Sequence, residues 1–443
     1  MTLKNEPPTS EILPQIIPRA EHNISRDDIS KNALKVLYRL HNAGYQAFLV
    51  GGCVRDELLE LHPKDFDVAT NAHPEEIKAL FGNCRLIGRR FRLAHVRFGQ
   101  EVIEVATFRA SVGEEEDHAD AVQDTHGRIL RDNVYGTIEE DVWRRDFTCN
   151  ALYYNIADFS VWDYVGGVEH IRQRRLVLIG DPERRLREDP VRMLRAVRFA
   201  AKLDFTVDPA VEQAMHDCVG RLASVPPARL FDEFLKMFQG GHAERTFELL
   251  WHYRLFDQLF PETARELDRS ESFGRFVKSA LVNTDRRVAE GKSVTPMFLL
   301  GVFFWEPVRI RASKMLDDEG GSETHALAVA AFDLSGAQQR ILSIPKRFTG
   351  PMREMLALQP RFEVMRGRRG LGLLEHRRFR AAYDFLMLRA EAGDADEQTA
   401  KFWTDVQLQS AEEREKSFEI SGPGRKSSKK RKPRRRRRPA NQP

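Results

Sequence analysis

The feature that most constrains the fold is a change in apolar spacing part-way along the chain. Between about residues 31 and 170, short apolar runs alternate with helical stretches, whereas after about residue 180 the strand pattern ends and helical spacing continues. The chain is therefore predicted to be α+β, with a small mixed-sheet domain followed by helical domains. The expected strands are Ala47–Gly51, Phe66–Thr70, His95–Phe98 and Val102–Phe108, and the expected helices before residue 170 are Ala33–Ala43 and Pro74–Phe81.

Helix-type spacing dominates the second half of the chain. It is found in Leu186–Leu203, Ala228–Gln239, Glu244–Phe256 and Arg377–Ala392. Two polar, Gly-containing segments are expected to be loops: Gly113–Arg128, a mobile loop inside the mixed-sheet domain, and Asp317–Ser322 between helices. A chain of 443 residues is also too long for a single ordinary core, so two to four domains are expected.

Cysteine usage and apolar runs indicate the compartment. The four cysteines are scattered and form no Cys-x-x-Cys pair, which argues against a structural zinc site or a disulfide framework. The polar N-terminus does not resemble a signal peptide, and no apolar run approaches the roughly 20 residues of a membrane span. We therefore expect a cytoplasmic protein without a transmembrane segment.

The positive charge is concentrated at one end. The formal net charge is +4, but Arg425–Arg438 contains eleven Lys and Arg and no acid, and the rest of the chain has a net charge of −7. Residues 417–443 are low in complexity and are expected to be disordered, so the basic run is predicted to meet a polyanion. Its cations are Arg425, Lys426, Lys429, Lys430, Arg431, Lys432, Arg434, Arg435, Arg436, Arg437 and Arg438.

The segment Leu49-Val-Gly-Gly-Cys-Val-Arg-Asp56 has the character of a phosphate-binding turn. Gly51 and Gly52 follow an apolar strand and would let the backbone approach a ligand closely. A helix that begins near Val54 would direct its first amides at a phosphate, and Arg55 would add a cation. The segment is not a P-loop, because no Gly-Lys-Ser/Thr follows at the required spacing.

Two aspartates follow nine residues later, at Asp65 and Asp67. Side chains alternate along a strand, so both carboxylates would project from one face while Phe66 points into the core. Such a pair suits Mg²⁺ ions that hold triphosphate oxygens, and Glu104 could supply a third carboxylate from a neighbouring strand. An isolated Asp-x-Asp is more often a solvated strand end, but the preceding glycine segment favours the metal interpretation.

Two further segments suggest nucleotide contacts. Arg144-Arg-Asp-Phe-Thr-Cys-Asn150 could place cations on phosphates and an acid on ribose hydroxyls, or could simply start a surface helix. In Arg187–Phe199, the side chains of Glu188, Asp189 and Arg192 would share one helix face. They could form a ladder of salt bridges within the helix, or an Asp/Arg pair that reads the edge of a base. Adenine and cytosine both present a donor and then an acceptor there, so this pattern does not choose between them.

Together these segments, in this order, resemble the class II branch of the nucleotidyltransferase superfamily, which contains bacterial poly(A) polymerases and tRNA CCA-adding enzymes. The resemblance covers about residues 30–260. Leu86-Ile-Gly-Arg-Arg-Phe-Arg-Leu-Ala-His-Val96 is similar to a signature of the poly(A) polymerases, whereas CCA-adding enzymes have a shorter, less basic stretch there. The family expected is therefore the bacterial poly(A) polymerases.

The resemblance implies a reaction and a set of site residues. The 3′-hydroxyl of an RNA would attack the α-phosphate of ATP and release pyrophosphate, with two Mg²⁺ ions bound. Asp65 and Asp67 would be the metal ligands, with Glu104 and Asp146 as further catalytic acids. The residues implied to bind the nucleotide are Gly51, Gly52, Arg55, Arg145 and Asn150, together with Asp189 and Arg192 at the base.

The resemblance also implies a domain layout. It predicts an N-terminal extension at 1–30, a catalytic nucleotidyltransferase head at 31–170, a helical neck with the base-reading motif at 171–240, a helical RNA-binding body at 241–416 and a basic tail at 417–443. The expected partners are ATP, single-stranded RNA 3′ ends, which the cations of the tail would hold, and the RNA-decay machinery. Two alternatives remain: a tRNA CCA-adding enzyme, and a catalytically inactive RNA-binding protein on the same fold. The second is disfavoured because binding alone does not require three metal-type acids.

Overall fold

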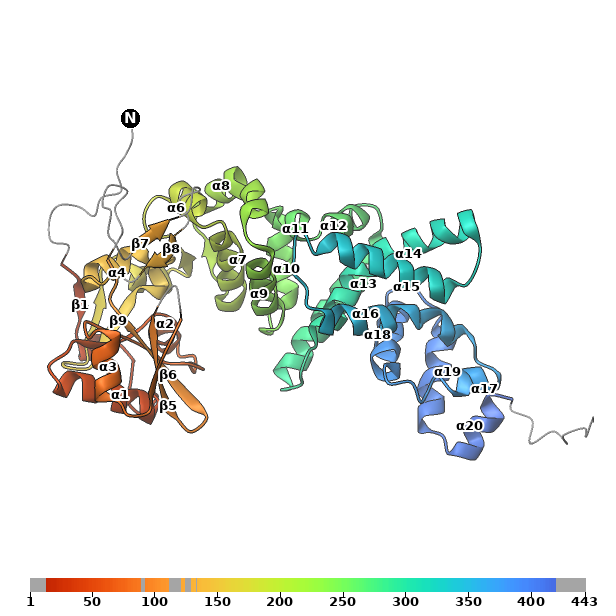
Figure 1. The fold of residues 1–443 in the computed structure, drawn as a ribbon, viewed down its shortest axis with the longest axis horizontal. Coiled ribbons are helices and arrows are strands. Elements are labelled where there is room, and N and C mark those ends of the chain that lie inside the picture. Colours follow the sequence, from red (N-terminus) through yellow and green to blue (C-terminus); the bar gives the residue numbers. More distant parts are fainter. Residues whose placement is uncertain (1–12, 89–91, 111–120, 124–128, 133, 420–443) are drawn as a thin grey trace, which may run out of the picture. The chain divides into compact units, whose positions relative to one another are not determined.

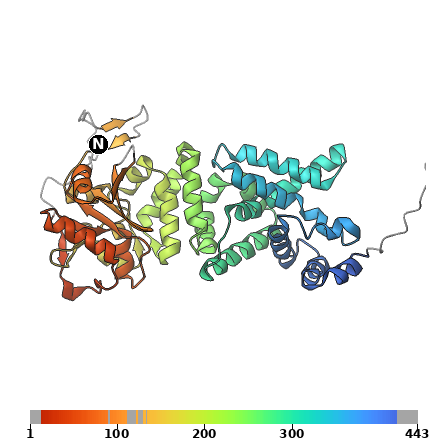
Figure 2. The same cartoon turned by 60° about the horizontal axis from the view of Figure 1, so that its bottom comes forward.

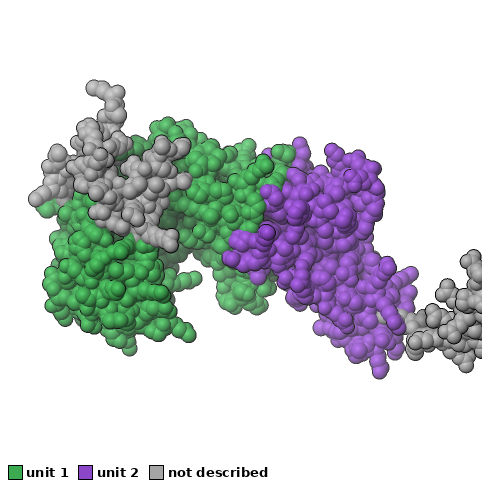
Figure 3. Space-filling view, in the orientation of Figure 1, with its two compact units in different colours: residues 1–265, 281–294, 337–344 green, residues 266–280, 295–336, 345–443 purple. Residues whose placement is uncertain are grey.

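The computed structural model describes residues 13–88, 92–110, 121–123, 129–132 and 134–419. The chain divides into two compact units (Figure 3). Unit 1 contains Met1–Arg265, Leu281–Val294 and Ala337–Ile344, and unit 2 contains Glu266–Ala280, Thr295–Gly336 and Pro345–Pro443. The five-part layout expected from the sequence remains a prediction, because this division does not test its boundaries.

Unit 1 is built around a mixed sheet of eight strands (Figure 1). Its strand order is β1-β10-β9-β2-β3-β6-β5-β4, and every neighbouring pair is antiparallel except β3 and β6, which are parallel. The strands are β1 Gln15–Ile17, β2 Ala47–Val50, β3 Asp67–Thr70, β4 Cys84–Ile87, β5 Leu93–Phe98, β6 Glu101–Thr107, β9 Leu152–Asn155 and β10 Val161–Asp163. The four predicted strands are therefore confirmed, and the fold class is α+β.

Helices cover the sheet and fix its apolar faces. Helix α1 (Lys31–Asn42) is capped by the Ser30 side chain, which accepts from two backbone amides, and α1 packs against β2 and β3. A second apolar cluster joins Phe48 and Val50 of β2 to α4 (Ile138–Arg144). All four residues of β2 are buried. Since strand side chains alternate between the two faces of a sheet, both faces of β2 are covered, which explains its continuous apolar sequence. Helix α3 (Pro74–Leu80) lies where predicted.

Two expectations for the first half need correction. No strand was predicted within the N-terminal extension 1–30, but Gln15–Ile17 forms β1 and pairs with β10. Most of the expected loop Gly113–Arg128 lies outside the described residues, although β7 (Ala121–Gln123) and β8 (Ile129–Asp132) form an antiparallel pair. β1 and β7 contain only three residues each, which is too few for a period-2 pattern to be recognised in the sequence.

The helical part of unit 1 contains one break that positions the site. Leu186–Leu203 was expected to be one helix, but it is divided into α6 (Pro182–Glu188) and α7 (Val191–Leu203). Between them Asp189 is extended, with φ −145° and ψ 91°, because the ring of Pro190 excludes the residue before it from helical geometry. Also against expectation, two short strands occur here, β11 (Arg175–Leu176) and β12 (Thr206–Val207), which pair in parallel.

The other helices of unit 1 largely follow the sequence pattern. They are α2 Gly52–Leu58, α5 Gly167–Arg172, α8 Pro209–Cys218, α9 Pro227–Phe238, α10 Ala243–His252, α11 Leu255–Leu259 and α12 Pro261–Leu267, of which the last continues into unit 2. The expected helix Glu244–Phe256 ends early, at His252, because Arg254 adopts a left-handed conformation with φ 57° and α11 begins after it.

Unit 2 is helical throughout its described residues, and its helices appear in green to blue in Figure 2. They include α14 Pro296–Glu319, α16 Lys346–Ala357, α17 Gly367–Leu371, α18 Phe379–Glu391, α19 Glu397–Leu408 and α20 Ala411–Ser417, as well as parts of α13 Glu271–Ala289 and α15 Glu323–Gln338. Edge-to-face contacts of Phe385 with Phe276 and Trp305 join three of them.

The sequence also made predictions about a loop, the basic tail and membrane-spanning segments in the second half of the chain. The expected loop Asp317–Ser322 is shorter than predicted, because α14 continues to Glu319 and stops at Gly320, whose φ is 69°. The cations Arg425–Arg438 lie outside the described residues. Among the described helices, none combines the length and apolar character required to traverse a bilayer.

Candidate active site

The glycine turn lies between β2 and α2. Gly51 has φ +80° and ψ −129°, a conformation that side-chain-bearing residues rarely adopt. A Cβ atom at Gly51 would lie 3.6 Å from Nη1 of Arg145 and 3.7 Å from the carbonyl oxygen of Asn150. The helix begins at Gly52, two residues earlier than expected. The glycine turn and the Arg144–Asn150 segment are therefore in direct contact, although they are far apart in the sequence.

Arg55 joins these two segments from inside the protein. Its residue is 2% exposed. Nε donates to Oδ1 of Asp56 at 2.8 Å, Nη1 donates to Oδ1 of Asn150, and the guanidinium lies 5.3 Å from the Phe199 ring centre. These contacts give Arg55 a bracing role. Its predicted contact with phosphate remains a prediction.

Asp65 precedes β3 and Asp67 is its first residue. Both are exposed, whereas Phe66 between them is buried. Asp67 opens the strand and stands directly opposite Glu104 in the parallel β3–β6 pair. Loss of hydration, followed by the charge of Glu104, raises the pKa of Asp67 to about 6, with Arg145 opposing the shift and Asp65 adding to it. Three acids thus share one electrostatic environment.

Asp65, Asp67 and Glu104 have the ligand atoms that a divalent cation prefers, but their side chains are not grouped around a single point. Carboxylate oxygens are the ligands that Mg²⁺ prefers, and a cation would relieve the like-charge crowding at Asp67. However, no three His, Cys, Asp or Glu side chains of the described chain are already grouped to hold a metal. Glu104 instead has Oε1 3.2 Å from Nε2 of His95, an approach without hydrogen-bond geometry.

Arg145 is held beside the glycine turn by a tyrosine and an acid. Its Nη2 and Nε donate to Oδ2 of Asp141 at 2.8 and 3.1 Å, and Nε also donates to the Tyr153 hydroxyl at 2.8 Å. Burial lowers the pKa of the guanidinium, but Tyr153 and Asp141 more than offset this effect and raise it. Arg145 is therefore a fixed cation, which suits a phosphate-binding residue.

Asp146 has all its accepting positions engaged within the protein. Oδ2 accepts from Nε and lies 2.5 Å from Nη2 of Arg195, on α7, while Oδ1 accepts from the Phe147 amide at 2.8 Å and the Asn150 side chain at 3.2 Å. Burial favours a higher pKa for Asp146, but Arg195 and these hydrogen bonds lower it. Asp146 and Asn150 therefore anchor their loop, and their predicted nucleotide contacts remain predictions.

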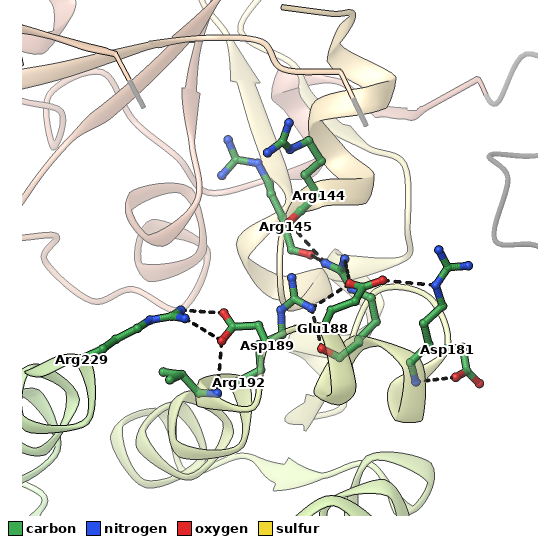
Figure 4. Close-up of polar contacts among 10 residues, drawn as sticks. Arg144, Arg145, Asp181, Glu188, Asp189, Arg192 and Arg229 are labelled. Atoms are coloured by element: carbon green, nitrogen blue, oxygen red, sulfur yellow. Dashed lines mark hydrogen bonds and ion pairs between the residues drawn. The ribbon is translucent and has the colours of Figure 1, made fainter. Parts of the chain in front are cut away.

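Asp189 and Arg192, the predicted base-reading residues, have partners that the sequence did not predict (Figure 4). Asp189 accepts two hydrogen bonds from Arg229 of α9, at 2.8 and 2.6 Å. Arg192 donates instead to the Arg185 carbonyl at 2.6 Å and to Oε2 of Glu188 at 3.2 Å. The expectation that Glu188, Asp189 and Arg192 share one helix face is wrong for Asp189, because the break at Pro190 removes it from the helix.

Three arginines that the sequence analysis left without a role complete this region. Arg229 holds Asp189, Arg195 holds Asp146, and Arg185 donates from Nη2 to the Arg144 carbonyl at 3.3 Å and to the Arg145 carbonyl. Each joins a helix to a distant loop. Helical periodicity places such residues on a helix but carries no information about long-range partners, so only the Arg-rich character of Arg184–Arg198 could have pointed to two of them.

Comparison with known proteins decides the family. Three family models match: the Poly A polymerase head domain at residues 47–177, the probable RNA and SrmB-binding site of polymerase A at 204–267, and the polymerase A arginine-rich C-terminus at 319–439. Poly(A) polymerase I of Salmonella typhi is 49% identical over 397 residues, which is 88% of this chain and 85% of that protein. The Haemophilus influenzae protein of the same name is 46% identical and covers 90% and 89%.

This chain belongs to the bacterial poly(A) polymerase family. It is a nucleotidyltransferase that polyadenylates RNA, as predicted. The CCA-adding enzyme of Lactobacillus helveticus is 36% identical over 236 residues, which is only 52% of this chain and 56% of that enzyme. The CCA-adding alternative is therefore a distant relative, and the catalytically inactive alternative is also set aside.

The fold of the polymerase is shared with the CCA-adding enzymes. The Bacillus stearothermophilus CCA-adding enzyme, solved in complex with CTP, aligns with a TM-score of 0.52 at 25% identity, over 84% of this chain and 82% of that one. The overall architecture therefore does not by itself distinguish the two groups of enzymes.

Proposed function

We propose that this polymerase adds AMP at a single site between the glycine turn, the acid group and the Arg144–Asn150 segment. One observation carries the proposal: the fixed cation of Arg145 lies against Gly51 and also acts electrostatically on Asp67. A triphosphate in this position would meet a cation on one side and the predicted metal ligands on the other. Gly51 and Gly52 would let its phosphates approach the backbone.

The acid group would carry the chemistry. Asp65 and Asp67, with Glu104 as a third acid, would hold two Mg²⁺ ions, which when bound supply charge balance for the attacking and leaving oxygens. The RNA 3′-oxygen forms the new bond to the α-phosphorus of ATP, and the bond to pyrophosphate breaks. The hydroxyl proton passes to a carboxylate of the site. Arg145 would donate to the phosphate oxygens throughout.

Base selection would depend on the break between α6 and α7. Asp189 would accept from the exocyclic amine of adenine and Arg192 would donate to a ring nitrogen. Arg229 would keep the Asp189 carboxylate in place, while Glu188 and the Arg185 carbonyl do the same for Arg192. A base edge with the reverse order of donor and acceptor would leave these groups unpaired, which disfavours GTP and UTP.

The remaining roles follow from family and charge. RNA 3′ ends are the proposed acceptor, the tail Arg425–Arg438 is proposed to hold RNA phosphates without sequence preference, and the RNA-decay machinery is a proposed partner. A cytoplasmic location is proposed from the cysteine pattern. The Arg144–Asn150 loop would contact ribose and phosphate. It would be held in place by the hydrogen bonds among Asp146, Asn150 and Arg55.

The direct test is primer extension with an unstructured RNA, Mg²⁺ and each NTP separately. We expect long products with ATP only. A second reaction with CTP, ATP and tRNA lacking CCA separates this activity from CCA addition, which would stop after two C and one A. Extension by all four NTPs at equal rates would contradict the proposed base reading.

A further inference from the structure

Outside the active site, unit 2 has an aromatic ring in solvent beneath a guanidinium. Phe332 on α15 is 61% exposed and is the only aromatic among the strongly exposed large hydrophobic residues of the described chain. The guanidinium carbon of Arg353 on α16 lies 5.0 Å from the centre of its ring. A single exposed apolar residue needs no explanation, so the argument depends on the surroundings of the ring.

The surface around this ring is open. Gly336 follows Phe332 by one turn of α15, and Gly350 precedes Arg353 by one turn of α16. A Cβ atom at either glycine would meet no heavy atom within 4 Å. The opposite face of α15 is the buried one, formed by Ala326, Leu327, Ala330, Ala331 and Leu334. A flat ligand could therefore approach the ring and the guanidinium without displacing side chains.

The surface is also positively charged. Lys346 is exposed on α16 two turns before Arg353 and on the same face of the helix, and within the described chain neither cation has a carboxylate partner. The acid next to Arg353, Glu354, is engaged by Arg377 and by Arg378, whose Nε lies 3.1 Å away. The acid next to Phe332 on α15 is turned about 100° away around the helix axis. We call Phe332, Lys346 and Arg353 the Phe332 patch.

The combination matches one class of ligand. Single-stranded nucleic acids bind to exposed aromatic rings, on which bases stack, together with cations that contact phosphates. Arginine guanidinium planes also stack on bases, so Arg353 extends the platform made by the ring. A protein partner would need an acidic and apolar surface to match. The polymerase's own substrate supplies bases and phosphates together, which favours RNA.

We propose that the Phe332 patch binds single-stranded RNA upstream of the 3′ end. Phe332 stacks one base, and Lys346 and Arg353 contact the flanking phosphates without sequence preference. The inference rests on the polyadenylation of RNA by this chain, but it adds a binding surface that takes no part in the chemistry. It predicts that the patch contributes to the affinity for RNA and does not change the rate of AMP addition at saturating primer.

The test compares two oligoadenylates of about 30 and about 6 nucleotides, measured by fluorescence anisotropy with the full chain at several salt concentrations. Phe332→Ala should raise the Kd for the long RNA about five-fold or more, while Phe332→Trp keeps the affinity. Arg353→Ala should raise the Kd for the long RNA as well, and it should also reduce the log–log salt slope by about 0.7, which Phe332→Ala should not do.

Two variants elsewhere in unit 2 serve as matched controls. Leu408→Ala removes an apolar side chain that is 86% exposed, and Arg275→Ala removes an exposed arginine that is paired with Glu271 at 3.0 Å. Both should bind the long RNA like the unmodified protein. Wild-type affinity in both Phe332→Ala and Arg353→Ala would overturn the proposal. Equal losses in the two controls would also overturn it, because the effect would then not be specific to the patch.

A last measurement separates this proposal from the proposed function. AMP addition to the short primer should be unchanged in every patch variant, since the active-site residues are untouched. If the unmodified protein fails to extend the short primer with ATP, the proposed function fails, whatever the affinities show. If extension is normal but the long RNA binds all variants equally, only the patch is excluded.

Discussion

The acids at the start of β3 and the acid of the Arg144–Asn150 segment differ in how the fold treats them. The Asp65 and Asp67 carboxylates have no ion pair within the described chain, and like charges crowd Asp67. Asp146, by contrast, is bound by Arg195, by a backbone amide and by Asn150. An acid left with uncompensated charge can receive a cation or ligand, whereas an acid with every oxygen engaged stabilises a loop. Asp65, Asp67 and Asp146 were all predicted to be catalytic acids, but the structure separates Asp146 from the other two.

The largest effect is expected from the acids without partners. Asp67→Ala and Asp65→Ala should reduce AMP addition at least about 1000-fold, because the predicted metal ligands are lost. Melting temperatures measured without Mg²⁺ should not fall, since each change removes a crowded negative charge and breaks no ion pair. A variant with near-normal activity in saturating Mg²⁺ would remove that residue from the chemistry.

The next effect concerns the bound acid. Arg195→Ala leaves the Asp146 carboxylate without its ion-pair partner in a largely buried position, and should reduce the free energy of unfolding by about 3 kcal/mol. Arg187→Ala breaks the exposed pair with Glu183 and is the matched control, whose denaturation midpoint should stay close to that of the unmodified protein. Equal denaturation midpoints for the two variants would show that Asp146 is not held by Arg195 as described.

A smaller effect is expected at the base-reading break. Arg229→Ala releases the Asp189 carboxylate and Arg192→Ala removes the proposed donor, so each should reduce discrimination between ATP and GTP by about 1–3 kcal/mol. The ratio of kcat/KM values for the two nucleotides measures this, and Arg192→Ala should change the ratio more than the affinity for triphosphate. An unchanged ratio in both variants would place base reading elsewhere.

The smallest effect on chemistry is expected from the tail. Truncation after Ser421 should weaken RNA binding and flatten its salt dependence, by about 0.7 in log–log slope for each RNA phosphate that the tail neutralises. The kcat at saturating RNA should stay nearly constant, because every proposed catalytic residue precedes it by more than 200 positions. Superimposable salt slopes for the full-length and truncated proteins would contradict the proposed clamp.

Residues close in sequence were predicted well, and long-range partners were not. The predicted exposure of Asp65 and Asp67 and burial of Phe66 are confirmed, although β3 begins only at Asp67. The pairing of Asp189 with Arg229 spans 40 residues and depends on how two helices pack. Pro190 by itself predicts that Asp189 leaves the helix, because proline excludes the preceding residue from helical geometry. Pro190 does not predict which arginine Asp189 then pairs with. Arg55 was predicted to be available to a phosphate because its partners Asn150 and Phe199 are far away in the sequence.

The most direct test of the central contrast is a paired measurement on Asp67→Asn and Asp146→Asn. Activity with ATP, Mg²⁺ and an RNA primer, and the melting temperature without Mg²⁺, are recorded on the same preparations. The account predicts that Asp67→Asn loses activity and keeps or gains stability, while Asp146→Asn loses stability through its weakened bond to Arg195. Two variants that lose stability equally, or an active Asp67→Asn enzyme, would contradict it.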